Sequence, residues 1–93
     1  MSEKIMTLHP QGKIGVNIDK AKYDQIKDAI VAALEKHGVL TFTELANAVE
    51  EELAGTFDGS IMWYVTTVKL DLEARGTVER IPKSSPQRLR LTA

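Results

Sequence analysis

The chain has no cysteine, which excludes a disulfide framework, a thiolate nucleophile and a thiolate zinc site. It has only two histidines, His9 and His37, and neither belongs to a spacing typical of metal ligands. Its glycines form no phosphate-binding loop, because neither Gly55 nor Gly59 leads into a Lys-Ser or Lys-Thr pair. We therefore expect no catalytic residues, no metal, no cofactor and no enzymatic activity.

Long apolar runs are also missing. No segment approaches the roughly 20 residues that a helix needs to span a bilayer. The first residues lack the basic-then-apolar pattern of a signal peptide, so we expect a cytoplasmic protein without membrane association. The 93 residues, 43% hydrophobic and 27% charged, suffice for one small globular domain.

The net charge of −1 is unevenly distributed along the chain. Residues 1–38 carry six lysines and five acidic residues, whereas residues 39–59 carry five acidic residues and no basic one. Residues 60–93 carry six basic and three acidic residues, a net charge of +3. Basic groups that could meet a phosphate backbone are thus concentrated toward the C-terminus.

Turn and capping residues divide the chain into an N-terminal β extension, three helices and a C-terminal hairpin. Short β-like runs at 5–8 and 14–18 flank a predicted four-residue turn at 9–12. Asp19, the Thr41–Glu44 capping box, and Asp58 or Ser60 would begin the helices, and Gly38 would end the first. Within a single domain, 1–93, the predicted segments are the extension 1–18, helices 19–38, 41–53 and 60–75, and a hairpin 77–92.

The third predicted helix is apolar on two sides. One side carries the expected core residues, whereas Trp63, Leu70 and Ala74 fall together on roughly the opposite side. A helix that is apolar on two sides is usually buried on both. The second side could be covered by the N-terminal strands of the same chain, by those of a second copy in a homodimer, or by a separate protein.

Two sequence segments resemble those of bacterial winged helix-turn-helix regulators. LDLEARGTVERI, with Leu72 and Gly76 leading into a hydrophobic-acidic-basic strand, is similar to the end of their third helix and the start of their wing. LTFTELANAV resembles their second helix. The resemblance implies an α+β fold, a winged helix-turn-helix with three helices and a C-terminal β-hairpin wing, here with an N-terminal β-strand extension.

A second resemblance covers nearly the whole chain. The strand 13–18, Tyr23, Trp63 and the run from Val68 to Gly76 are similar to features of a family of small uncharacterised bacterial proteins. That family is a domain of unknown function, so this resemblance supports the fold and implies no activity.

The winged-helix resemblance implies candidate contacts to double-stranded DNA. The third helix would enter the major groove, with polar side chains on base edges and the wing along phosphates. However, the first half of that helix has no Arg, Asn or Gln for strong base recognition, and Glu50 to Glu52 oppose binding from the second helix. The candidates are Ser60, Thr66, Thr67 and Lys69 in the helix and Lys83, Arg88 and Arg90 in the wing.

We therefore expect a homodimeric DNA-binding protein, in the manner of a small transcriptional regulator. The alternative is a winged-helix module for protein–protein interaction or dimerisation without DNA binding. In that case Trp63, Leu70 and Ala74 would lie in the interface. A basic wing favours the first hypothesis, and the second apolar side of the third helix favours the other.

Overall fold

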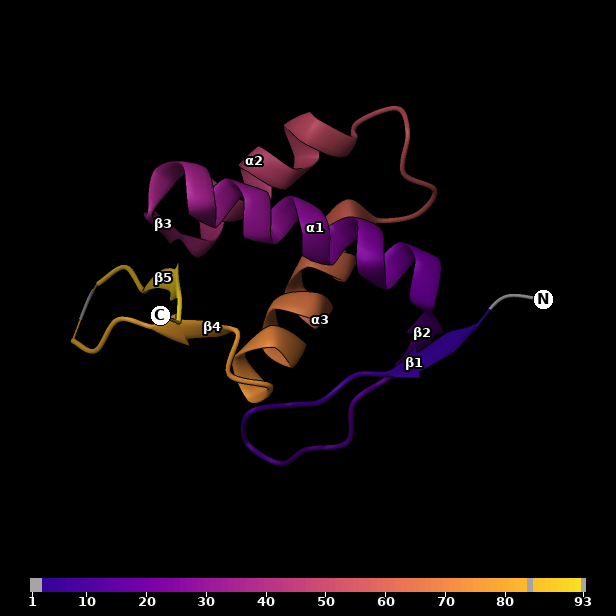
Figure 1. Ribbon diagram of the computed structural model, residues 1–93, viewed down its shortest axis with the longest axis horizontal. Coiled ribbons are helices and arrows are strands. Elements are labelled where there is room, and N and C mark those ends of the chain that lie inside the picture. The colour runs from indigo at the N-terminus through magenta and orange to yellow at the C-terminus, as the bar shows by residue number, and fades with distance from the viewer. Residues whose placement is uncertain (1–2, 84, 93) are drawn as a thin grey trace.

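Three helices and two small antiparallel sheets make up the computed structural model, an α+β structure that describes residues 3–83 and 85–92 (Figure 1). The helices are α1 (Lys20–His37), α2 (Phe42–Leu53) and α3 (Ile61–Ala74). The strands are β1 (Lys4–Met6), β2 (Asn17–Asp19), β3 (Val39–Thr41), β4 (Val78–Arg80) and β5 (Arg88–Leu91). Residues 1, 2, 84 and 93 of the predicted domain, including Ser84 in the predicted wing loop, lie outside the described residues.

The strands form two separate sheets. β1 pairs with β2, and β3, β5 and β4 form a three-stranded sheet in which β5 is central. In the larger sheet Leu89 lies opposite both Leu40 and Arg80. The strand that precedes α2 is thereby joined to the C-terminal hairpin.

The predicted helix ends are confirmed by the side chains that cap them. The Asp19 carboxylate accepts a hydrogen bond from the backbone N–H of Ala21, and Thr41 and Glu44 form the complete capping box. Ser60, rather than Asp58, caps α3 by accepting from the backbone N–H of Trp63. These local signals set where each helix begins.

The predicted N-terminal strands were too long. The expected turn is present, since the Gly12 N–H donates to the His9 carbonyl at 2.9 Å. However, the regular ladder is restricted to β1 and β2, so Ile14 does not belong to a strand. Beyond Met6 the Leu8 N–H donates to a carboxylate of α3 instead of a facing strand, which ends the ladder.

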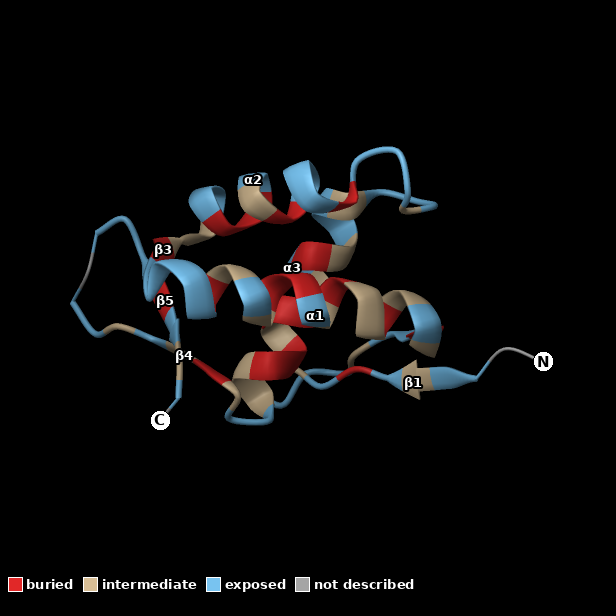
Figure 2. Ribbon diagram, turned by 45° about the horizontal axis from the view of Figure 1, so that its top comes forward, coloured by how far each residue is buried: buried red, intermediate tan, exposed pale blue. Residues whose placement is uncertain are grey.

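The core lies where the three helices meet the larger sheet. Figure 2 shows the buried residues on the facing sides of the helices and in the adjoining strands. Each fully buried Leu, Ile or Val side chain stabilises the fold by roughly 1.5–3 kcal/mol. The large fully buried apolar side chains include Ile26, Ile30, Leu34, Leu45, Val49, Val65, Val68, Leu72, Val78 and Leu89.

Candidate functional site

The N-terminal hairpin, residues 4–19, packs against the C-terminal half of α3 (Figure 1). Its loop and α3 line a small open pocket of about 120 Å³. The N–H of Leu8 donates to Oδ1 of Asp71 at 2.8 Å, which fastens the loop to the helix. The pocket is lined by Thr7, Leu8, His9, Ile14, Gly15, Val16, Thr67 and Leu70.

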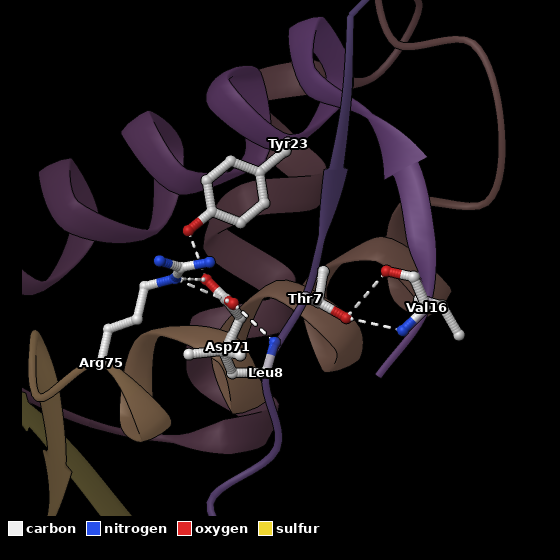
Figure 3. A network of polar contacts seen from close by, with 6 residues as sticks. All are labelled: Thr7, Leu8, Val16, Tyr23, Asp71 and Arg75. Atoms are coloured by element: carbon white, nitrogen blue, oxygen red, sulfur yellow. Dashed lines mark hydrogen bonds and ion pairs between the residues drawn. The ribbon is translucent and has the colours of Figure 1, made fainter. Parts of the chain in front are cut away.

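Asp71 is the centre of a buried polar network (Figure 3). Its fully buried carboxylate accepts hydrogen bonds from the Tyr23 hydroxyl and the Leu8 N–H, and pairs with Arg75 Nε at 2.9 Å. A carboxylate can be buried without a large penalty only when it is paired and hydrogen-bonded in this way. The network therefore joins α1, α3 and the N-terminal hairpin at one point.

This environment changes the acidities of both donor side chains. Burial, together with the hydrogen bond to Asp71, raises the pKa of the Tyr23 phenol above its ordinary value. The hydrogen bond to the Asp71 carboxylate likewise raises the pKa of the Arg75 guanidinium. Tyr23 thus stays a neutral donor and Arg75 a cation across the usual pH range.

Lys69, a predicted DNA contact that would have to be exposed, is buried. Its residue is only 7% exposed, and Nζ lies 3.6 Å from Glu73 Oε2 and 5.3 Å from the centre of the Phe42 ring. Burial lowers the pKa of the ammonium group. The predicted exposure was wrong because Phe42, from α2, lies over this part of α3.

The first turn of α3 presents apolar side chains to solvent instead. Met62 and Trp63 are 48% and 46% exposed. The Trp63 ring meets the Tyr64 ring edge-on with centroids 4.9 Å apart, and Phe57 meets Tyr64 in the same manner at 5.1 Å. Lys22 Nζ lies 5.6 Å from the centre of the Tyr64 ring. The aromatic cluster holds Trp63 in place while leaving nearly half of it accessible.

The polar residues expected to meet base edges already make contacts within α3. Ser60 caps the helix, and the Thr66 hydroxyl donates to the Met62 carbonyl at 3.0 Å. Thr67 lines the pocket under the N-terminal loop. Only Ser60 and Thr66 of these residues are exposed.

The C-terminal hairpin keeps part of its predicted positive surface. Arg90 pairs with Glu79 on the neighbouring strand, while Lys83 and Arg88 are exposed. Arg88 lies opposite Thr41 in the sheet register. Of the basic residues predicted for the wing, Arg88 and Arg90 belong to β5 and Lys83 to the loop that precedes it.

The apolar stripe predicted on α3 is divided between two environments. Leu70 is half-buried and lies against the N-terminal loop of the same chain, which is one of the three covers expected from the sequence. Ala74 is also half-buried. Trp63, at the other end of the stripe, is exposed and is not among the residues that line the pocket under the N-terminal loop.

Sequence reasoning missed the Asp71 network. The spacing of Asp71 and Arg75, four residues apart in a helix, is a signal that could have indicated the ion pair. The contacts of Asp71 with Tyr23 and Leu8 join residues 48 and 63 positions away, and no local pattern reveals them.

The sequence profile of the family of unknown function DUF6958 matches residues 4–89. The chain belongs to this family. Because the match begins in β1 and ends in β5, the N-terminal hairpin is part of the family's common unit. No curated protein and no solved structure matches the chain.

Two further features bear on the site. Within residues 3–83 and 85–92, no three His, Asp or Glu side chains are grouped so that they could hold a metal ion. Among the described helices, none is long and apolar enough to cross a membrane.

Proposed function

We propose that the chain is a winged-helix module that binds another protein through its hairpin–α3 face. This face consists of the exposed apolar residues of the N-terminal hairpin and of the first turn of α3. The proposal assigns no catalytic step, metal or cofactor to the chain. The members of the hairpin–α3 face are Met6, Leu8, Ile14, Val16, Met62 and Trp63.

The winged-helix assignment is supported by the order of the elements and by one strand pairing. From α1 onward the order is helix, strand, helix, helix and two strands. β3 pairs with β5, so the strand between the first two helices extends the C-terminal hairpin into a sheet. Both features agree with the resemblance of the sequence to winged-helix regulators.

The observation that carries the protein-binding proposal is where apolar surface is exposed. Of the seven large apolar residues exposed in the described part of the chain, six belong to the hairpin–α3 face. Ile14 is 94% exposed, although it would stabilise the fold if it were buried. Exposed apolar residues on the N-terminal hairpin and at the start of α3 would suit a protein-interaction surface, in which Trp is a frequent anchor.

The same face is poorly suited to DNA. A helix in the major groove needs polar and cationic side chains directed outward. Lys69 is buried, and the N-terminal loop occupies α3 at Thr67 and Leu70. What α3 leaves accessible near its start is mainly Met62 and Trp63.

A second candidate function is DNA binding through the wing, as in a small transcriptional regulator. The exposure of Lys83 and Arg88 favours it, together with Ser60 and Thr66 at the start of α3. Three or four phosphate contacts would give only modest, strongly salt-dependent affinity. The pairing of Arg90 with Glu79 reduces the positive charge that this surface offers.

Site-specific photo-crosslinking in cells tests the protein-binding proposal. A photoreactive amino acid replaces Met62 in one variant and Gln87, an exposed residue of the C-terminal hairpin, in a matched control. We expect a discrete protein adduct at position 62, lost when Ile14→Ser and Trp63→Ser are added, and no such adduct at position 87. The proposal is wrong if position 62 gives no protein adduct, or if the adduct persists in the variant carrying both serines.

A further inference from the structure

Residues of α1 and α2 line a groove between the two helices. α2 lies on the side of α1 away from the N-terminal hairpin (Figures 1 and 2). The volume of the groove is about 280 Å³. Alanines form its walls, and their short side chains leave space where larger ones would fill the angle between the helices. The walls of this α1–α2 groove are Ala29, Ala32, Ala33 and Ala48.

The two rims of the α1–α2 groove carry opposite charges. Lys36, next to His37 at the end of α1, forms a basic rim, and Glu51 and Glu52, near the end of α2, form an acidic rim. Among the described residues, none of the ion pairs within 4.0 Å includes Lys36, Glu51 or Glu52. The two rims thus line the same groove, and no ion pair joins them among the described residues.

The acidic rim is electrostatically unfavourable in the isolated chain. Glutamates in the last turns of a helix lie at the negative end of the helix dipole. The segment 39–59 supplies no lysine or arginine to offset them. A cation brought from outside the chain would therefore stabilise Glu51 and Glu52.

We propose that two copies of the chain associate through the α1–α2 groove, with the basic rim of each copy against the acidic rim of the other. A two-fold interface joins the same patch on both subunits, so each contact occurs twice. A groove with one basic and one acidic rim can meet its own copy with opposite charges facing. The alanine walls allow the helices of the two copies to approach closely, because the interaxial distance depends on the side chains at the contact.

This dimer interface is separate from the hairpin–α3 face. α2 and the N-terminal hairpin lie on different sides of α1 (Figure 2). The dimer therefore leaves two hairpin–α3 faces accessible, one on each copy. Its existence does not depend on whether those faces bind a protein or DNA.

Sedimentation equilibrium of the full chain at low salt tests the dimer, since exposed charge pairs are screened as salt increases. We expect the wild type to dimerise. Lys36→Glu, and separately Glu51→Lys with Glu52→Lys, should each weaken self-association by at least about tenfold, because like charges then face each other twice. Lys27→Glu is the matched control, because nine residues at 100° per residue place Lys27 on the opposite side of α1 from Lys36.

Mixing the two charge-reversed variants gives the sharpest result. In an equimolar mixture, the α1 rim of the Lys36→Glu chain is acidic and faces the α2 rim of the Glu51→Lys, Glu52→Lys chain, which is basic. The α2 rim of the first chain is still acidic and faces the α1 rim of the second chain, which is still basic. We therefore expect two poorly associating variants to form a heterodimer on mixing. Far-UV circular dichroism should show both charge-reversed variants folded, since Lys36, Glu51 and Glu52 are exposed.

Three results would overturn the proposed dimer. They are a wild-type chain that stays monomeric at every concentration, charge-reversed variants that dimerise as well as the wild type, and a mixture that stays monomeric. Position-62 adducts made of two copies, unaffected by Lys36→Glu, would place self-association on the hairpin–α3 face instead.

Discussion

The backbone N–H of Leu8 donates a hydrogen bond to the buried carboxylate of Asp71, 63 positions further along the chain. Through this contact the N-terminal hairpin is held on α3, the helix that the sequence resemblance had suggested as the DNA contact. The proposed hairpin–α3 face consists of the exposed apolar residues of this hairpin and of those at the start of α3. The proposed function depends on this arrangement.

Removing the Asp71 carboxylate should destabilise the protein and release the hairpin. Asp71→Ala leaves the Tyr23 hydroxyl and the Leu8 N–H without their acceptor, which should lower the free energy of unfolding by about 2–3 kcal/mol. Urea denaturation measures the loss. Hydrogen exchange of the Leu8 amide should accelerate more than exchange in the core of α2, and equal acceleration in both would show that Asp71 does not fasten the hairpin specifically.

Tyr23 should make stability fall at alkaline pH. Its folded-state pKa is raised above the ordinary value near 10, so the phenol stays protonated in the folded chain after it ionises in the unfolded chain. The stabilisation is fully present below about pH 10 and decreases by up to about 1.4 kcal/mol per pH unit as the pH rises above it. Urea denaturation between neutral and alkaline pH measures this slope.

Two phenylalanine variants separate Tyr23 from other groups that titrate in the same range. Tyr23→Phe lacks the buried hydroxyl and should be less stable than wild type at neutral pH, with the difference narrowing as the pH rises. Tyr64→Phe leaves the Tyr23–Asp71 hydrogen bond in place, so the alkaline loss of stability caused by Tyr23 should persist in this control. An unchanged slope in Tyr23→Phe would contradict the assignment.

Gly15 should be required for the N-terminal hairpin. A Cβ atom at this position would lie 1.8 Å from the carbonyl oxygen of Thr7, too close for the backbones to remain where they are. Gly15→Ala should therefore accelerate hydrogen exchange of the Thr7 amide, which donates to the Val16 carbonyl at 2.8 Å, while the helical far-UV circular dichroism signal persists.

Gly12→Ala is the control. Nothing lies within 4 Å of the Cβ position of Gly12, and its positive φ should lower the stability by only roughly 1–2 kcal/mol. Equal effects from the two substitutions would show that the close contact is unimportant.

Lys69 should be replaceable by an apolar residue of similar length. Its ammonium group is desolvated, and Glu73, its partner, also pairs with Arg80 at 2.6 Å. Lys69→Met should leave the free energy of unfolding within about 1 kcal/mol of wild type or raise it, because buried ion pairs often stabilise less than apolar packing. A loss of several kcal/mol in urea denaturation would mean that the ion pair is required.

Local signals in the sequence predicted the helices well. Each helix is capped by a side chain that accepts a hydrogen bond from a backbone N–H two or three residues further along the chain. These caps are Asp19, Thr41 of the Thr41–Glu44 capping box, and Ser60. The N-terminal strands were less predictable. Their ladder stops where Leu8 turns to Asp71, a contact across most of the chain.

The candidate site was predictable only in part. The sequence placed Trp63 and Leu70 together on a second apolar side of α3, but in the structure Trp63 is exposed and Leu70 is half-buried against the N-terminal loop. Lys69 follows Val65 by four residues and precedes Leu72 by three, so helical spacing could have placed it beside the core stripe. Its long apolar stem makes such a position tolerable.

The most direct test of the hairpin–α3 face is the emission of Trp63, the single tryptophan, during titration with mixed-sequence duplex DNA. The titration is carried out at low salt and repeated at higher salt. If the face binds protein, the emission should be unchanged at both salt concentrations. A change at low salt that disappears at higher salt would place DNA beside α3 and contradict the proposed function.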